Sequence, residues 1–386
     1  MTEQLTRRQV LERAALGGAA ITFPGILAAC GSNGTKAGEG TTTVEKTLAK
    51  TLRFSNWTLY IDNVKGGKHP TLDKFEKKTG VHVKYMEDIN GNAEFFGKIQ
   101  GPLQRGQSID RDIIVMTDNS RYPSLLIRKG WVEKLDKSAI PNMKNLIAQQ
   151  RHPAWDPDRD YSLPWQSGMT GIGFNDKLTD PVLTIDDLLT NPKLKGKVGV
   201  LDDYSGSLTL VMLANGDDPQ KVTNASFDRA IKKLKKASDS GQIRRFYGND
   251  YSDAFAKGDL AATMSWSGDV VQLALANKHL HWGLPTDGGE IWTDNMLIPK
   301  GGEVYTASVY MNFVYDPKIA AEIEDYVNYI CPVRGAKAQL LKQDPAVANN
   351  KLIFPTKEML GNVTSIDTAA LNNEKYLTTW NNLISA

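Results

Sequence analysis

Short apolar runs alternate with amphipathic stretches along most of this chain, and this alternation limits the fold more than any other feature. Strands and helices that alternate over short connections favour largely parallel sheets joined by crossover helices, which predicts an α/β fold. The chain has 386 residues, enough for two domains of ordinary size. We expect Gly80 to end the first helix. The expected strands are 51–54, 81–85, 112–116, 171–174, 197–201 and 261–265, and the expected helices are 69–79, 93–105, 122–129, 185–190, 206–214, 224–239 and 270–277.

The first thirty residues have the pattern of an export signal. Arg7 and Arg8 form a twin-arginine pair, and the apolar run 14–29 is shorter than the ~20 residues of a membrane-spanning helix. Leu27-Ala28-Ala29-Cys30 resembles the lipobox of bacterial lipoproteins, in which the cysteine is lipidated. We therefore expect residues 1–30 to be a signal peptide, export by the twin-arginine route, and an acyl anchor on Cys30 that holds the protein outside the cytoplasm. The alternative is an ordinary helix with a stray cysteine.

The rest of the composition is that of a globular protein behind a flexible tether. Residues 31–50 are rich in Gly and Thr and are expected to form the tether. The chain is 41% hydrophobic and 23% charged, with a net charge of +2. Its Lys and Arg residues form no stripe dense enough to follow a phosphate backbone, so we do not expect nucleic acid as a partner. With Cys30 lipidated, Cys331 is the one remaining thiol, and no intrachain disulfide is expected.

The motifs that indicate catalysis or a metal site are missing from the sequence. It has no Gly-x-Ser-x-Gly elbow, no His-Glu-x-x-His and no phosphate-binding Gly-x-x-x-x-Gly-Lys-Ser/Thr. His279 and His281 are two residues apart, but no third ligand lies near them in the sequence. We therefore expect no enzyme activity, no cofactor and no metal. An exported hydrolase that uses paired carboxylates stays open as an alternative.

Trp and Asp residues recur just after the predicted strands. In open α/β sheets, ligands bind outside the carboxyl ends of the strands, so side chains at these positions are expected to gather around one site. One such cluster would be a coincidence of packing, but the pattern occurs five times. The clusters are Trp57, Thr58 and Tyr60; Thr117, Asp118 and Asn119; Asp202 and Asp203; Trp266 and Asp269; and Trp292 and Asp294, which precede the apolar run 296–298.

Such a set of side chains suits a chain of methylene groups that carries protonated amines. An indole face attracts a cation by ~0.5–1 kcal/mol when exposed and by ~2 kcal/mol or more when water is excluded. A carboxylate adds a charge-assisted hydrogen bond to an ammonium group, about twice as strong as a neutral one. A sugar would stack on Trp without needing several anions, and an amino acid would need an Arg for its carboxylate. The clusters contain no nearby Arg.

At these positions the sequence resembles the bacterial polyamine-binding proteins, the receptors of spermidine/putrescine ABC importers. Asn56-Trp57-Thr58-x-Tyr60-Ile61 resembles the start of their mature chains, and Asp160-Tyr161-Ser162-Leu163-Pro164-Trp165 the segment before their first interdomain crossing. Trp266-Ser267-Gly268-Asp269 and Gly289-x-x-Trp292-x-Asp294 resemble their second-lobe tryptophan motif and their ligand-binding Trp-x-Asp motif. The resemblance runs from about Leu52 to about Gly335.

The resemblance implies a role for each matching residue, with some departures. The receptors for spermidine carry a glutamate three residues after the position of Asp203, where this chain has Gly206, and Asp269 is a candidate to replace it. They carry an aromatic residue at Asn119, and a hinge tyrosine for which Tyr329 is a candidate substitute. The implied roles are an aromatic box of Trp57, Tyr60, Trp266 and Trp292, amine binding by Asp203, Asp269 and Asp294, and neutral hydrogen bonds from Thr58 and from Thr117 or Asn119.

The resemblance also implies the architecture and the partners. The fold would be the two-lobed periplasmic-binding-protein fold of type II, with a hinge between lobes that are each a mainly parallel sheet flanked by helices. The lobes would be 51–167 plus 293–339 and 168–292 plus 340–386, with crossings near Ser167, Trp292 and Gln339. The partners would be a polyamine and the permease of an ABC importer, and the protein would be a monomer. A quaternary amine, a cationic amino-acid derivative or a sugar stays open as the ligand.

Overall fold

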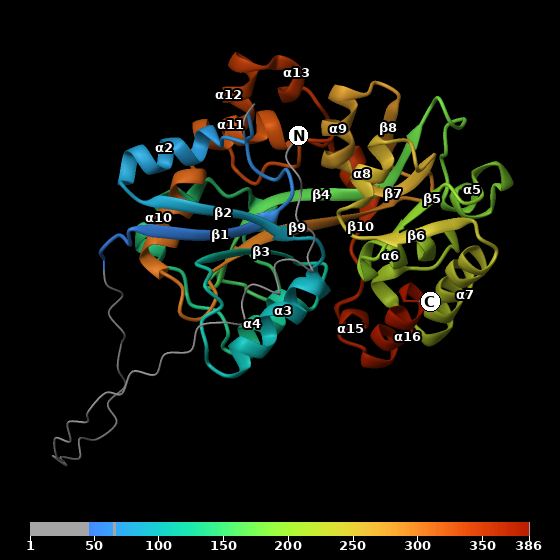
Figure 1. Ribbon diagram of the computed structural model, residues 1–386, viewed down its shortest axis with the longest axis horizontal. Helices are drawn as coiled ribbons and strands as arrows, with labels where there is room; N and C mark the ends of the chain where they lie inside the picture. The colour runs from blue at the N-terminus through green and yellow to red at the C-terminus, as the bar shows by residue number, and fades with distance from the viewer. Residues whose placement is uncertain (1–45, 65–66, 386) are drawn as a thin grey trace, which may run out of the picture. The chain divides into compact units, whose positions relative to one another are not determined.

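The computed structural model describes residues 46–64 and 67–385. Their strands form one sheet in the order β2-β1-β3-β9-β4-β7-β5-β6, with β10 paired to β9 and β8 paired to β4 (Figure 1). The strands are β1 (Thr51–Trp57), β2 (His82–Ile89), β3 (Ile113–Thr117), β4 (Ser162–Asn175), β5 (Val198–Leu201), β6 (Ile243–Tyr247), β7 (Ala262–Trp266), β8 (Leu280–Gly283), β9 (Gly289–Leu297) and β10 (Val363–Thr364).

Each end of the sheet is built from parallel strands. At one end β1 lies between β2 and β3, and Phe54 is in register with Tyr85 and Ile113. At the other end β5 lies between β6 and β7. The residues of β3 and β5 are all buried, as expected for strands covered on both faces. The predicted α/β units are therefore present at both ends.

Two long strands, β4 and β9, run across the middle of the sheet and join its two ends (Figure 1). They are antiparallel to each other, β9 is antiparallel to β3, and β4 is antiparallel to β7. Ser167 is in register with Thr293, and Gly168 with Trp292. The first two predicted crossings thus lie directly opposite each other on neighbouring strands. The sequence showed only an apolar run at 296–298 in this region, whereas β9 begins at Gly289.

Helices cover the sheet around two separate hydrophobic cores. The first core is built from residues 52–165 and 292–348, and the second from 172–280 and 366–383. Helix α2 ends at Gly80 in a left-handed conformation, as predicted. Around the first core lie α2 (Pro70–Thr79), α3 (Asn92–Gln104), α4 (Tyr122–Arg128), α10 (Val304–Val314), α11 (Pro317–Val327), α12 (Ala336–Gln343) and α13 (Pro345–Ala348). The remaining helices are α5 (Ile185–Thr190), α6 (Tyr204–Ala214), α7 (Asn224–Asp239), α8 (Tyr251–Ala256), α9 (Ser267–Ala276), α14 (Lys357–Gly361), α15 (Thr368–Leu371) and α16 (Glu374–Ile384).

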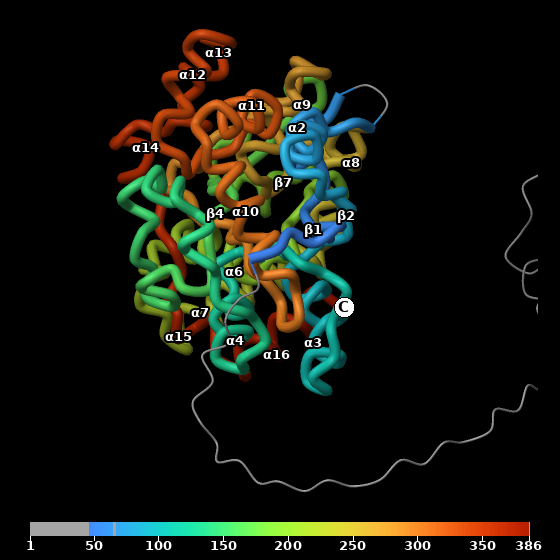
Figure 2. The backbone as a smooth tube through the Cα atoms, turned by 90° about the vertical axis from the view of Figure 1, so that its left-hand side faces the viewer, coloured from blue at the N-terminus to red at the C-terminus, as the bar shows by residue number. Residues whose placement is uncertain are grey.

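The packing of the C-terminal helices does not fit a third crossing near Gln339. Leu340 and Ala348 are fully buried in the first core. Figures 1 and 2 both show α12 and α13 beside α11. The chain next contributes to the second core at Ile366. The apolar side chains of α12 and α13 therefore keep the chain with the first core beyond the predicted boundary.

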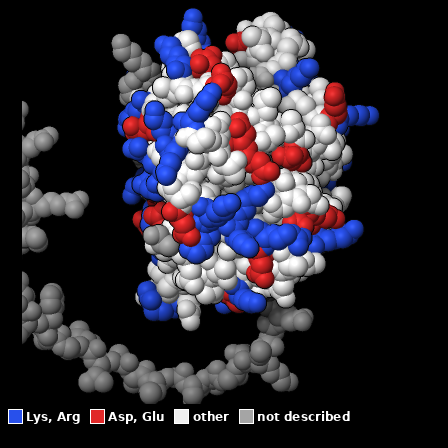
Figure 3. All heavy atoms as spheres, turned by 90° about the vertical axis from the view of Figure 1, so that its right-hand side faces the viewer, with Lys and Arg blue, Asp and Glu red and all other residues white. Residues whose placement is uncertain are grey.

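A basic surface lies on the side of the molecule that carries α7 (Figure 3). The lysines of α7 include exposed Lys232, Lys235 and Lys236, while Lys233 pairs with Asp186 of α5. Buried Phe227 and Leu234 fix the opposite side of α7 on the second core. The basic run is thus the solvent-facing side of an amphipathic helix.

Candidate ligand-binding site

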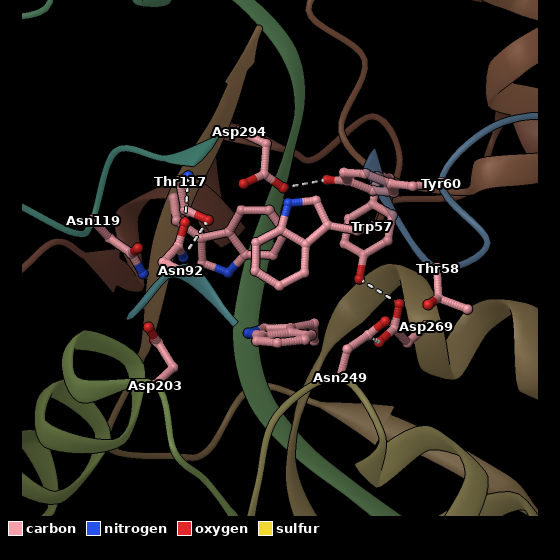
Figure 4. Close-up of a pocket in the computed structure, with 13 residues that line it drawn as sticks. Trp57, Thr58, Tyr60, Asn92, Thr117, Asn119, Asp203, Asn249, Asp269 and Asp294 are labelled. Carbon is pink, nitrogen blue, oxygen red and sulfur yellow. Dashed lines mark hydrogen bonds between the residues drawn. The ribbon is translucent and has the colours of Figure 1, made fainter. Parts of the chain in front are cut away.

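A cavity lies where the ends of β1, β3 and β7 meet the middle of β9 (Figure 4). All ten side chains that the sequence predicted as ligand contacts line it. Asn92, Asn249 and Tyr329 complete the lining. Cys30, the predicted lipidation site, lies outside the described residues. The predicted residues at the cavity are Trp57, Thr58, Tyr60, Thr117, Asn119, Asp203, Trp266, Asp269, Trp292 and Asp294.

Local structure explains how these side chains reach the cavity. Trp57, Thr117 and Trp266 are the last residues of β1, β3 and β7. Asp203 is the N-cap of α6, where its side chain accepts a hydrogen bond from the backbone of Gly206 at 2.8 Å. The aspartate at position 269 lies in the first turn of α9. Of the ten predicted residues, only Trp292 and Asp294 lie inside a strand, on β9. The rule that ligands bind at strand ends therefore accounts for most of the site.

Five aromatic rings form a continuous wall. Neighbouring ring centres are 6.1 Å apart for Trp57 and Trp266, 6.3 Å for Trp266 and Trp292, 5.6 Å for Trp292 and Tyr329, and 5.1 Å for Tyr329 and Tyr60. Three of the four pairs are edge-to-face. Trp266 packs against both hydrophobic cores, so the wall is continuous from one core to the other.

Asp294 is the most deeply buried acid of the cavity, with 3% of its surface exposed. Its Oδ2 accepts a hydrogen bond from the hydroxyl of Tyr60 at 2.7 Å (Figure 4). Its Oδ1 has no hydrogen-bond partner among the described residues. Burial raises the pKa of Asp294 to about 7, and the nearby carboxylate of Asp118 adds to the rise. A donor with a positive charge would satisfy the free oxygen and restore the ionised form.

Asp269 is held by more donors. Its carboxylate accepts hydrogen bonds from the hydroxyls of Tyr329 at 2.7 Å and Tyr251 at 2.9 Å, and from Nδ2 of Asn249 at 3.1 Å. Burial raises the pKa of Asp269 to about 6, while these three donors act in the opposite direction. The carboxylate is therefore fixed in place with its charge uncompensated by any Lys or Arg in the cavity lining.

The neutral side chains mainly orient one another. Asn92 donates from Nδ2 to Oγ1 of Thr117 at 2.8 Å and accepts from the Thr117 backbone at 3.0 Å. Asn119 donates to Glu290 at 3.1 Å, and its Oδ1 has no partner among the described residues. Thr58 is exposed at the rim. The indole Nε1 of Trp57 is buried without an acceptor in the described part of the chain.

A wider cleft adjoins the cavity. The two spaces share the side chains of Trp57, Asn92, Asn119, Asp203 and Trp266. Beyond them the cleft extends along α3, α4 and the first residues of α6 to α16. A small molecule that enters through this cleft meets the aromatic wall and Asp203 first.

The two histidines noted in the sequence share one aspartate as their partner. His279 and His281 both contact Asp176, each at 2.7 Å. Within residues 46–64 and 67–385, no group of three or more His, Cys, Asp or Glu side chains is arranged to hold a metal. In the same part of the chain, no helix is long and apolar enough to cross a membrane.

Comparison with known proteins identifies the family. Residues 71–355 match the family model of the bacterial extracellular solute-binding proteins. The chain belongs to this family. The cavity between its two hydrophobic cores is therefore the candidate solute site, and the aromatic wall and acids line it.

Named relatives and a solved structure extend this match. The spermidine/putrescine-binding periplasmic protein of Escherichia coli (strain K12) is 26% identical over 315 residues, which cover 81% of this chain and 85% of that protein. The putrescine-binding periplasmic protein SpuD of Pseudomonas aeruginosa (strain UCBPP-PA14) is 29% identical over 331 residues, with 81% and 85% covered. A Listeria monocytogenes structure, provisionally assigned to a spermidine/putrescine ABC transporter, is 26% identical with a TM-score of 0.74, covering 87% of this chain and 98% of its own. The predicted two-lobed fold of type II is confirmed.

Sequence reasoning missed part of the lining of this solute-binding protein. Asn249 follows β6, a strand that the sequence did not predict, so its position after a strand could not be noticed. Asn92 opens α3 after β2, where the strand-end rule applied to the full strand would have found it. Tyr329, a candidate substitute for the hinge tyrosine, lines the cavity and binds Asp269.

Replacing Gly268 with Ala should damage the site by displacing Tyr329. A methyl group at position 268 would overlap the Tyr329 ring. We expect Gly268→Ala to destabilise the protein by about 1–3 kcal/mol in urea unfolding, the usual cost of overpacking. The control is Gly97→Ala in the interior of α3, where a methyl group meets nothing within 4 Å and should stabilise the helix by about 0.5–1 kcal/mol. Equal stability of the two variants would contradict this packing of Tyr329.

Proposed function

We propose that this solute-binding protein captures a linear polyamine, such as spermidine or putrescine, between its two lobes and delivers it to the permease of an ABC importer. The observation that carries the proposal is the charge of the cavity. Among the described residues, the cavity lining contains three aspartates and no Lys or Arg. The named relatives that bind spermidine or putrescine support the same ligand class. The role is binding, with no catalysis.

The cavity suits both parts of a polyamine. Methylene groups that leave water for an indole face contribute ~0.8 kcal/mol each, and the wall offers three indoles. Ammonium groups can donate to Oδ1 of Asp294, which lacks a partner among the described residues, and to the carboxylates of Asp203 and Asp269. A quaternary amine has no N–H group and would leave the Asp294 oxygen unsatisfied. A solute with a carboxylate would face three acids of its own sign.

One observation favours a second candidate, a cationic solute that also carries a hydrogen-bond acceptor. The indole N–H of Trp57 is buried without an acceptor within the described chain, and a fully protonated polyamine offers none. A cationic amino-acid derivative or an amine with a hydroxyl group would supply one. A sugar alone would leave the charges of the three aspartates uncompensated.

The two lobes and the membrane anchor complete the proposal. Lobe one would comprise 51–167 with 293–348, and lobe two 168–292 with the chain from Ile366 onward; apart from Trp292 at the predicted crossing, which packs in the first core, the two cores divide the chain in this way. The mature protein would work as a monomer outside the cytoplasm. It would leave the cell interior by the twin-arginine route and stay attached to the membrane through lipidated Cys30, on the strength of the N-terminal motifs.

Titration calorimetry decides the ligand class. We expect spermidine or putrescine to bind the purified mature protein at micromolar concentration, and glucose to give no binding heat. A mass spectrum of the small molecules that co-purify with the protein would identify the natural ligand directly. The absence of binding to both polyamines would overturn the proposed function, and binding of a hydroxylated amine alone would favour the second candidate.

Asp294→Asn tests the central charge. The substitution keeps the shape of the side chain but removes the anion that an ammonium group would meet. Losing one partner of a buried charge pair costs about 2–5 kcal/mol, so polyamine affinity should fall about 30-fold or more by calorimetry. The control is Asp239→Asn, the same change on the exposed end of α7, which should leave the affinity unchanged. An uncharged ligand would tolerate both substitutions.

Cys30→Ala tests the anchor. The substitution removes the thiol that would carry the acyl chains, so we expect the protein to move from the membrane pellet to the supernatant after ultracentrifugation of lysed cells. Metabolic labelling with palmitate should mark the natural protein and not the variant. Cys331→Ala is the matched control, because Cys331 is buried in the first core and should not affect the distribution. A variant that stays with the membrane would contradict lipidation at Cys30.

A further inference from the structure

A buried glutamate that the proposed function does not use lies directly behind the cavity. Glu290 is on β9, two residues before Trp292 and four before Asp294. Because side chains alternate along a strand, all three belong to the same side of β9. Glu290 has no exposed surface and does not line the cavity. Asn119 and Asp203, which do line the cavity, are its neighbours: Asn119 donates a hydrogen bond to Glu290, and the carboxylates of Asp203 and Glu290 both lie beside Gly206.

Gly206 leaves room for this glutamate. A Cβ atom at position 206 would lie 2.8 Å from Oδ2 of Asp203 and 3.0 Å from Oε2 of Glu290. The two carboxylates therefore converge over the space that a side chain at position 206 would occupy, one from the start of α6 and one from β9. Glu290 thus reaches from another strand to the space beside Gly206, the position at which the resemblance implies a glutamate. The sequence had pointed to Asp269 for this part, yet Asp269 lies on α9 among its own donors.

The surroundings of Glu290 are built from neutral donors. Oε1 accepts hydrogen bonds from Nδ2 of Asn119 at 3.1 Å and from the hydroxyl of Ser205, and Oε2 accepts from the hydroxyl of Thr170 at 2.9 Å. These donors come from the loop after β3, from α6 and from β4. In the part of the chain that the structure describes, no cation pairs with Glu290. The titratable group that faces it is Asp203.

Two adjacent carboxylates without a cation cannot both stay ionised at low cost. Burial and the charge of Asp203 raise the pKa of Glu290, and burial raises that of Asp203. An ammonium group of the ligand that binds at Asp203 would lower the pKa values of both acids, because its positive charge lies next to them.

We propose that Asp203 and Glu290 hold one proton between them in the empty receptor and release it when an ammonium group of the ligand contacts Asp203. In this step the O–H bond of the carboxyl group breaks, its electron pair stays on the carboxylate, and the proton passes to water. Glu290 is then a positioning residue that acts on the ligand through Asp203. The proposal rests on the proposed function, because it needs a cationic ligand.

The consequence is a binding affinity that rises with pH. A bound cation lowers the pKa of the pair, so each proton that leaves on binding makes the affinity rise about tenfold per pH unit. The window lies between about pH 5 and about pH 8, from the ordinary range of carboxylates to the raised pKa. Asp294 and Asp269 also face the ligand, with pKa values of about 7 and about 6, and add their own proton release. The contribution of Asp203 and Glu290 is therefore measured as the difference in proton release between the natural protein and a variant of Glu290.

Glu290→Gln measures this difference. Calorimetry with spermidine, in two buffers of different ionisation enthalpy at one pH, counts the protons released on binding. We expect the variant to release up to one proton fewer than the natural protein and to show a flatter dependence of affinity on pH. Glu290→Asp keeps a titratable group and should restore part of the release. Glu358→Gln removes a charge from the exposed helix α14 and should change neither quantity.

A second measurement needs no ligand and separates this inference from the proposed function. Because the pKa of Glu290 is higher in the folded protein than in the unfolded chain, its contribution to stability is present at low pH and is lost as pH rises through the raised value. Glu290→Gln should therefore gain stability relative to the natural protein between about pH 5 and about pH 8. If spermidine does not bind the natural protein, the proposed function fails. If spermidine binds but the proton count and the pH dependence of stability equal those of Glu290→Gln, the proton-sharing pair is overturned.

Discussion

Uncompensated negative charge in a cavity walled by aromatic rings is the constraint on which the site depends. Asp294 is almost fully buried, one of its oxygens has no hydrogen-bond partner in the described part of the chain, and Asp203 and Asp269 face the same space. Burial raises the pKa of all three, so each acid in the empty cavity holds a proton more readily than it would in water. A cation gains from both partners at once, because the carboxylates supply charge and the indole faces supply attraction where little water is present.

The two central strands place this charge where both lobes can reach it. β4 and β9 pair along most of their length, and their antiparallel register sets Gly168 against Trp292. A methyl group at position 168 would lie 2.6 Å from one atom of the Trp292 ring and 2.8 Å from the Tyr329 ring. The missing side chain of Gly168 therefore lets two rings of the wall pack closely against the backbone of the crossing strands. The aromatic wall and the crossing between lobes depend on the same backbone.

Much of this site could be predicted from the sequence because strand ends are visible in it. Trp57, Thr117 and Trp266 end apolar runs, and the topology of an α/β sheet brings such ends together. Strand β9 was harder to predict. Trp292 and Asp294 alternate with other residues along it, which is the pattern of a strand that has one polar side facing a ligand. Glu290 was not recognised as a neighbour of Asp203, because the two carboxylates meet in the space left by the missing side chain of Gly206. Gly206 is 84 positions away in the sequence, so this space is visible only in the folded chain. The sequence predicted a third crossing near Gln339, whereas Leu340 and Ala348 pack in the first core; short helices such as α12 carry no signal in the sequence of which core they join.

The distribution of the acids also links binding to the relation between the lobes. Asp294 belongs to β9 and bonds to Tyr60 of the first core, whereas Asp203 and Asp269 begin helices α6 and α9, whose apolar residues pack in the second. Carboxylates that approach one another from two lobes repel when they are ionised, and the repulsion grows as water is excluded. A linear cation placed between them replaces repulsion by two attractions. The same charges thus contribute to the free energy of binding and to the free energy of bringing the lobes together. A ligand without positive charge would fill the cavity, but the repulsion between the carboxylates would remain.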